Sequence, residues 1–95
     1  MKVRLDPDEA MAVLRSMPPG PRKRLRAALQ SLATDPSGRS NGLDVKRLRT
    51  PGQPPAFRLR VGDWRAVWLL RRQSVDVIRI FHRSEGYGWL DRRYP

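Results

Sequence analysis

Two stretches on either side of Gly62-Asp63 constrain the fold more than any other feature of the sequence. Residues 57–61 alternate apolar and basic side chains, and residues 64–70 return as an apolar run that one arginine interrupts. Side chains alternate between the two faces of a strand, and a Gly-Asp pair is typical of a two-residue hairpin turn. The sequence therefore predicts an antiparallel β-hairpin in which Arg60 lies opposite Arg65.

The predicted register gives the hairpin two faces of different chemistry. One face is apolar and should receive helices; it holds Phe57, Leu59, Val61, Trp64, Ala66, Trp68 and Leu70. The other face carries Arg58, Arg60 and Arg65. Like charges directly opposite each other destabilise a sheet, so the basic face is either a solvated surface with splayed side chains or a place where an anion is held. Periodicity alone leaves both interpretations open.

A third strand is predicted over residues 74–83, which are rich in Val and Ile. We favour a connecting loop of odd length at 71–73, because it buries isoleucines rather than arginines, whereas an even loop would reverse the faces. This choice puts Ile78, Ile80, Asp76 and His82 on the inner face, and Arg79, Phe81 and Arg83 on the outer face. In the tail, residues 84–95, two glycines weaken any helix.

The first part of the chain predicts a short strand and the start of a helix. Residues 2–5 alternate as a strand does. Asp6 is placed as the N-cap of the first helix, with Pro7 at its first position. Pro18-Pro19-Gly20 ends that helix, and Pro21 starts the next one.

The second helix has a clear apolar stripe, which indicates that it packs on a sheet. Leu25, Ala28, Leu29 and Leu32 recur at i, i+3, i+4 and i+7, and Asp35-Pro36 closes the helix. Residues 37–42 and 50–55 predict loops, with a short extended segment between them. Helices followed by strands indicate an α+β fold, with an N-terminal helical hairpin packed on a small antiparallel β-sheet in a single domain over 1–95.

Composition narrows the function classes. The chain has 20 Lys and Arg against 9 Asp and Glu, a formal net charge of +11, and the excess lies after residue 20. Such a density indicates a polyanionic partner: nucleic acid, an anionic membrane surface or an acidic protein. With no cysteine and one histidine, thiol catalysis and zinc sites are implausible, so we expect no metal and no cofactor. Neither a membrane span nor an export signal is visible, so we expect a soluble, cytoplasmic protein.

Four motifs spread over nearly the whole chain occur in a distinctive order. They are Asp35-Pro36, the segment Leu43 to Leu48, the stretch from Phe57 to Trp68, and His82-Arg83 followed by Tyr87. This order resembles the RelE/ParE superfamily of bacterial toxin–antitoxin systems. The most specific parts are the basic alternating strand with its Gly-Asp-aromatic-Arg turn, and the tyrosine four residues after the strand-end arginine. The fold that this resemblance implies, two helices against a small antiparallel sheet, agrees with the one inferred from the residues.

The resemblance also implies an activity and a set of site residues. RelE-like members enter the ribosomal A site and cut messenger RNA without a metal; the 2′-hydroxyl attacks the adjacent phosphate and leaves a cyclic phosphate. The catalytic residues implied here are Arg58, Arg60, Arg65, Arg83 and Tyr87, and the RNA-binding residues are Lys46, Arg47 and Arg79. Preorganised guanidinium groups suit this chemistry, because the phosphorane carries extra negative charge. Tyr87 is expected to stack on a base or to align the 2′-hydroxyl.

One departure from the family concerns proton transfer. Where several RelE-like enzymes have lysine in the central strand, this chain has Arg58 and Arg60. Arginine stays protonated and cannot act as the general base. Proton transfer would then come from Tyr87, His82, Glu85 or the ribosome, or be replaced by charge stabilisation alone.

Two other functions remain alternatives to the ribosome-dependent mRNA endonuclease that the motifs favour. The ParE branch shares the fold but inhibits DNA gyrase and cuts nothing. A non-catalytic nucleic-acid-binding module would rest on the charge alone. The expected partners are a cognate acidic antitoxin, the ribosome and mRNA, with DNA gyrase as the target under the ParE-like alternative; no membrane partner is expected.

Overall fold

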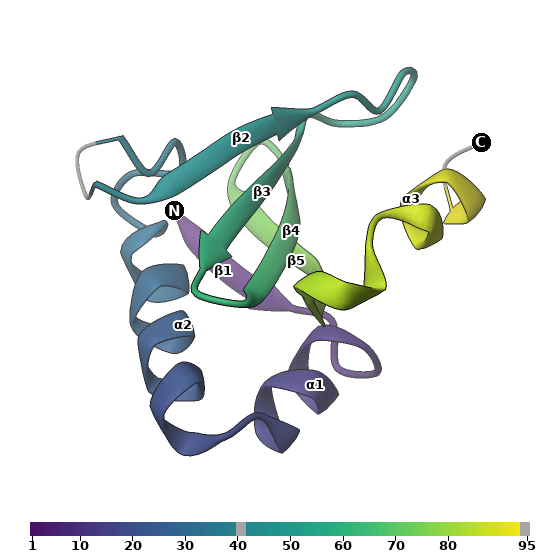
Figure 1. Cartoon of the computed structure of the whole chain (residues 1–95). Helices are drawn as coiled ribbons and strands as arrows, with labels where there is room; N and C mark the ends of the chain where they lie inside the picture. Colours follow the sequence, from purple (N-terminus) through teal and green to yellow (C-terminus); the bar gives the residue numbers. More distant parts are fainter. Residues whose placement is uncertain (40–41, 94–95) are drawn as a thin grey trace.

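The computed structural model describes residues 1–39 and 42–93, and it has helices on both sides of one sheet (Figure 1). The elements in chain order are β1 (Lys2–Leu5), α1 (Ala10–Ser16), α2 (Pro19–Ser31), β2 (Asp44–Leu48), β3 (Ala56–Val61), β4 (Trp64–Leu70), β5 (Ser74–His82), the 3₁₀ turn η1 (Arg83–Glu85) and α3 (Gly88–Arg93). The α+β class is confirmed. Residues 40–41 of the predicted loop and 94–95 of the predicted tail lie outside the described residues.

The sheet has the strand order β1-β5-β4-β3-β2. Strands β2 to β5 run antiparallel, as expected, but β1 joins the edge parallel to β5, with Val3 beside Val75. The predicted hairpin register is confirmed, since Arg60 pairs with Arg65. Gly62 takes a φ of +58° in the turn, a conformation that other residues adopt only at a cost.

A β-bulge in β5 corrects the predicted faces of the third strand. Val67 pairs with Arg79 and Trp68 pairs with Val77, so Ile78 has no partner on β4. The extra residue reverses the alternation on its N-terminal side. Ile78 and Ile80 therefore lie on opposite faces, not on one. Asp76, expected on the inner face, pairs instead with Leu69, whose side chain belongs to the outer core.

The inner face of the sheet packs against α1 and α2, as the helical hairpin predicted. Leu14 of α1 and Leu25 and Leu29 of α2 share a core with Leu59 and Trp68 of the sheet. Both Leu25 and Leu59 are fully buried. His82 lies on this face too, because it pairs with Trp64 and their rings meet edge-on with centroids 5.4 Å apart.

The outer face carries a second core that the sequence did not predict. Val67, Ile78 and Phe81 pack there with Trp89 and Leu90 of α3, so α2 and α3 flank the sheet from opposite sides (Figure 1). A short helix, α3, does form in the tail, where the two glycines were expected to weaken any helix. Burial of Trp89 and Leu90, which are 5% and 8% exposed, stabilises α3 where helix propensity alone would not.

Both predicted helix starts shift by a few residues. Asp6 Oδ1 accepts hydrogen bonds from the backbone N–H groups of Asp8 and Glu9, at 2.9 and 3.0 Å, as an N-cap does, but α1 itself begins at Ala10. The second helix begins at Pro19 rather than Pro21, because proline at the first helical position lacks only an N–H that would be unpaired. It ends at Ser31, before Asp35-Pro36.

Candidate active site

The predicted basic residues of β2, β3 and β4 meet in an open pocket on the outer face of the sheet. The pocket holds about 270 Å³ and is lined by Lys46, Leu48, Arg58, Arg60, Arg65 and Tyr87. Four of these six residues are cations. The pocket lies next to the second core, so the outer face is apolar under α3 and basic beyond it.

Strand register brings these cations together. Lys46 pairs with Arg58 across β2 and β3, and Arg60 pairs with Arg65 across β3 and β4. Paired residues of neighbouring strands point to the same face, and residues two apart on one strand do too. Alternation in three strands therefore gathers four positive side chains on one small area. Such an arrangement costs stability unless counter-charges are present, and it suits a bound phosphate.

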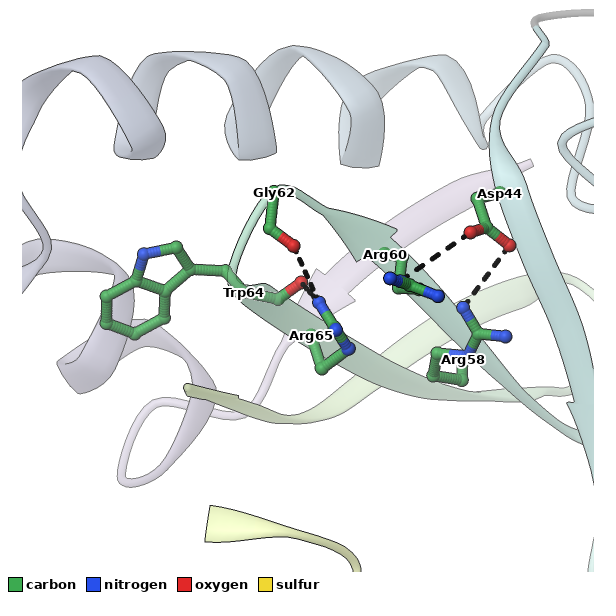
Figure 2. Close-up of polar contacts among 6 residues, drawn as sticks. All are labelled: Asp44, Arg58, Arg60, Gly62, Trp64 and Arg65. Carbon is green, nitrogen blue, oxygen red and sulfur yellow. Dashed lines mark hydrogen bonds and ion pairs between the residues drawn. The ribbon is translucent and has the colours of Figure 1, made fainter. Parts of the chain in front are cut away.

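Asp44 supplies a counter-charge that sequence analysis missed. Its carboxylate lies 3.3 Å from Arg58 Nη1 and 3.7 Å from Arg60 Nε (Figure 2). It starts β2 and pairs with Arg60, two residues before Lys46 on the same face. The Arg58 side chain is only 11% exposed, whereas that of Asp44 is 56% exposed. The signal in the sequence was the alternation of Asp44 with Lys46, which becomes informative only once β2 is placed beside β3.

Arg65 is held against the hairpin turn. Its Nη1 donates hydrogen bonds to the carbonyl oxygens of Gly62, at 2.8 Å, and Trp64, at 3.0 Å (Figure 2). Burial lowers the pKa of Arg65 from its ordinary value, and repulsion from Arg60 lowers it further. An arginine with this environment is still charged at neutral pH, and it is oriented before any ligand arrives.

Tyr87 closes the pocket from the segment between η1 and α3. Its ring packs edge-on against Phe81 of the second core, with centroids 5.2 Å apart. Burial raises the pKa of Tyr87 above its ordinary value, although the charges of Arg58, Arg65 and Arg60 act in the opposite direction. A tyrosine with an ordinary pKa of about 10 is already protonated at neutral pH, so the phenol of Tyr87 can donate a hydrogen bond but cannot act as a base there.

Arg83 and the two suggested proton-transfer residues of the β5 end lie outside the pocket lining. Arg83 Nε is 3.4 Å from the carboxylate of Asp63 in the hairpin turn, and its charge still contributes to the lowered pKa of Arg65. His82 faces the α1 and α2 side, where its Nδ1 lies 2.9 Å from Ser84 Oγ. Glu85 is exposed in η1 and does not line the pocket.

Two of the three suggested RNA-binding residues also lie elsewhere. Arg79 stacks over Trp89, 5.0 Å from the ring centroid, and lies 3.7 Å from the carboxylate of Glu9. Arg47 lines a larger hollow of about 630 Å³ beside the loop between β2 and β3. That hollow gathers fewer charges than the smaller pocket, so we place the candidate site at the smaller one. Lys46 is the suggested RNA-binding residue that does line it.

The described part of the chain holds no group of three or more His, Cys, Asp or Glu side chains arranged as metal ligands. It also has no helix long and apolar enough to cross a bilayer.

Comparison with known proteins gives matches among solved structures only. No family model and no curated protein matches the sequence. The RelE–RelB complex of Pyrococcus horikoshii matches with a TM-score of 0.74 and 21% identity, covering 90% of this chain and 97% of that one. The chain has the RelE fold. The resemblance seen in the motifs is thus confirmed at the level of the fold.

Two further RelE structures give the same result. A free-state double mutant of E. coli toxin RelE matches with a TM-score of 0.66 and 21% identity, over 99% of this chain and 97% of that one. The RelBE2 toxin–antitoxin complex of Mycobacterium tuberculosis matches with a TM-score of 0.54 and 27% identity, over 86% and 96%. The three matches cover 86–99% of this chain and 96–97% of the other chains.

Proposed function

We propose that this protein is the toxin of a type II toxin–antitoxin system and acts as a ribosome-dependent mRNA endonuclease. The observation that carries the proposal is the pocket in which Lys46, Arg58, Arg60 and Arg65 meet Tyr87. The same fold occurs in RelE toxins, two of which are described in toxin–antitoxin complexes. The likeness to those proteins supports the toxin part of the proposal, and the pocket of this chain supports the RNA-cleavage part.

The pocket suits attack of a 2′-hydroxyl on the neighbouring phosphate. Negative charge on the phosphoryl oxygens rises in the transition state, and guanidinium groups already in place stabilise it without reorganising. Arg65 meets that requirement, because the carbonyls of Gly62 and Trp64 fix its orientation. Tyr87 would stack on an unpaired base or donate its hydroxyl hydrogen bond to a sugar or phosphate oxygen.

Dependence on the ribosome follows from how open the pocket is. Four cations attract any RNA, but a shallow basic surface does not by itself align the 2′-oxygen, the phosphorus and the leaving oxygen. We propose that the ribosome holds the message in that alignment. Free RNA would then bind in a salt-dependent manner and be cut slowly.

We propose an acidic antitoxin as the partner, because a negatively charged protein is attracted to a chain with a formal net charge of +11. A segment carrying carboxylates and apolar side chains would neutralise the basic pocket and suppress cutting. Attraction of this kind weakens with salt, whereas burial of apolar anchors does not.

The test is brief induction of the protein in bacterial cells, followed by primer extension on transcripts and gel analysis of plasmid supercoiling. Cuts in translated messages with normal supercoiling would support the endonuclease. Intact messages with accumulated gyrase–DNA complexes would favour the ParE-like gyrase inhibitor instead. A matched transcript without a ribosome-binding site controls for ribosome dependence. Unimpaired growth despite abundant folded protein would count against any toxin.

A further inference from the structure

Asp44 does not line the pocket itself, but its carboxylate pairs with two arginines that do. Its carboxylate lies within 4 Å of both Arg58 and Arg60, and it shares a face of β2 with Lys46. More than half of the Asp44 side chain is exposed, so the carboxylate is accessible from solvent beside the arginines of the pocket. Besides burial, the charge of Asp44 raises the pKa of Tyr87, which lines the pocket.

The other suggested proton acceptors are poorly placed or in the wrong protonation state. Tyr87 keeps its proton at neutral pH because the ordinary pKa of tyrosine is about 10, and burial raises the pKa of Tyr87 further. His82 lies on the opposite face of the sheet beside Trp64, and Glu85 is outside the pocket lining. The arginines cannot release a proton. Asp44 also lies outside the lining, but unlike Glu85 it is a described carboxylate that pairs directly with Arg58 and Arg60 of the pocket.

We propose that Asp44 is the general base of the cleavage reaction and that Lys46 is its general acid. This inference rests on the proposed nuclease function. Asp44 takes the proton of the 2′-hydroxyl as the 2′-oxygen bonds to phosphorus. The bond from phosphorus to the 5′-oxygen breaks, and the Lys46 ammonium gives that oxygen its proton. The products are a 2′,3′-cyclic phosphate and a 5′-hydroxyl. Transfer of the proton from Asp44 to Lys46 through water then restores both groups.

The contacts of Asp44 fit the role of a positioned base. Arg58 and Arg60 each carry five N–H donors in a planar fork, so each can hold the carboxylate with one donor and a phosphoryl oxygen with another. The two arginines would then fix the distance between base and phosphate. Lys46, two residues along the same strand, lies opposite Arg58 and is therefore displaced along β2 from the base. Such a displacement suits in-line attack, in which acid and base act on opposite sides of the phosphorus.

The first test compares Asp44→Asn with the wild type in single-turnover cleavage on programmed ribosomes. We expect a loss of about 10²- to 10⁴-fold in the cleavage rate, with RNA binding unchanged or tighter because a negative charge is gone. Asp76→Asn is the matched control. It makes the same change at a carboxylate that also pairs with an arginine, 2.6 Å from Arg71 Nε, away from the pocket. It should cut at the wild-type rate.

The second test separates the acid from the base. A message with sulfur in place of the scissile 5′-bridging oxygen has a leaving group that needs no proton. Lys46→Met should cut ordinary RNA slowly but cut this substrate at nearly the wild-type rate, whereas Asp44→Asn should stay slow on both. Lys23→Met, on the surface of α2, is the charge-matched control.

The possible outcomes test the proposed function and the further inference separately. If the wild type cuts no message, the proposed function fails and the inference with it. If the wild type cuts and folded Asp44→Asn cuts as fast or faster, Asp44 is only a counter-ion and the inference alone fails. Asp44→Ser serves as the second variant. If both variants lose their circular dichroism and melting transition, Asp44 is a structural residue, and the inference is overturned. Failure of the sulfur substrate to rescue Lys46→Met overturns the assignment of the acid.

Discussion

The ring of Tyr87 lies edge-on to that of Phe81, with centroids 5.2 Å apart, and this contact joins the basic pocket to the second core. Phe81 in turn meets Trp89 of α3 at 5.7 Å. The residue that closes the pocket is therefore positioned by packing against the second core beside α3. The geometry of the basic pocket therefore depends on the second core, which lies next to it on the same face of the sheet.

Arg65→Ala should slow cleavage strongly while leaving the fold intact. Loss of one preoriented guanidinium should cost about 2–4 kcal/mol in the transition state, or roughly 30- to 1,000-fold in rate. Stability should change little, since the mutation also relieves the like charge opposite Arg60. Single-turnover cleavage and urea unfolding measure the two effects. Arg72→Ala, an exposed arginine in the β4–β5 turn, is the control. If Arg65→Ala were fully active, the basic face would be a solvated surface with no part in cleavage.

Arg83→Ala should have a smaller effect than Arg65→Ala. Arg83 pairs with Asp63 at the hairpin turn and lies outside the pocket lining, so it contributes to the field at Arg65 rather than to a direct contact. We expect a loss of about tenfold or less, which corresponds to about 1.4 kcal/mol or less. The same cleavage assay measures it. A loss equal to that of Arg65→Ala would mean that both arginines hold one phosphate in the bound state.

Tyr87→Phe separates two roles of the tyrosine. The ring and its contact with Phe81 are kept, so folding should be unchanged. A cleavage rate near that of the wild type would indicate stacking on a base, whereas a loss of about 10²-fold or more would indicate that the hydroxyl aligns or polarises a reacting oxygen. We expect the second result, because the protonated phenol borders the arginine pocket. Tyr87→Ala should be impaired in either case.

Removing a negative charge and removing a positive charge near Tyr87 should shift its pKa in opposite directions. In a Tyr94→Phe background Tyr87 is the one tyrosine left, and tyrosinate absorbance reports its pKa. Asp44→Asn should lower that pKa and Arg60→Ala should raise it, since Asp44 acts against ionisation and Arg60 favours it. Folding favours the protonated form, so stability is independent of this group below the unfolded pKa of about 10. It falls as pH rises through the folded pKa, because the unfolded chain ionises first. Equal pKa values in all three proteins would place Tyr87 away from both charges.

Two glycines with similar backbones should tolerate alanine very differently. Gly38 and Gly62 have φ values of +72° and +58°, so alanine is strained at both, at about 1–2 kcal/mol. At Gly38 the new Cβ would also lie 2.6 Å from Val45 Cγ2, whereas nothing lies within 4 Å at Gly62. We expect Gly38→Ala to destabilise the protein by at least about 1 kcal/mol more than Gly62→Ala in urea unfolding. Equal losses of stability in the two variants would show that the chain around Gly38 shifts to admit the new Cβ at no cost in free energy.

The sequence alone determined the central hairpin and the chemistry of its two faces. Period-2 alternation and the Gly62-Asp63 turn are local signals, and together they fix which residues lie opposite one another. The pairing of Arg60 with Arg65 and the membership of Arg58, Arg60 and Arg65 in one face follow directly. The stripe of Leu25, Ala28 and Leu29 is equally local, and it packs where it was expected.

Tertiary structure decided the features that depend on more than one segment. The bulge at Ile78 could not be predicted from alternation, because a single extra residue in β5 is selected by the burial of both faces of the sheet. Formation of α3 depends on the apolar surface of Val67 and Phe81 beneath it, which outweighs the low helix propensity of its glycine. Asp44 joins the arginines only because β2 lies antiparallel to β3 in one register. Local periodicity specifies the direction of each side chain. Which side chains meet depends on how the strands and helices pack into shared cores. The free energy gained by that packing comes from contacts between residues far apart in the chain, so a local pattern does not reveal it.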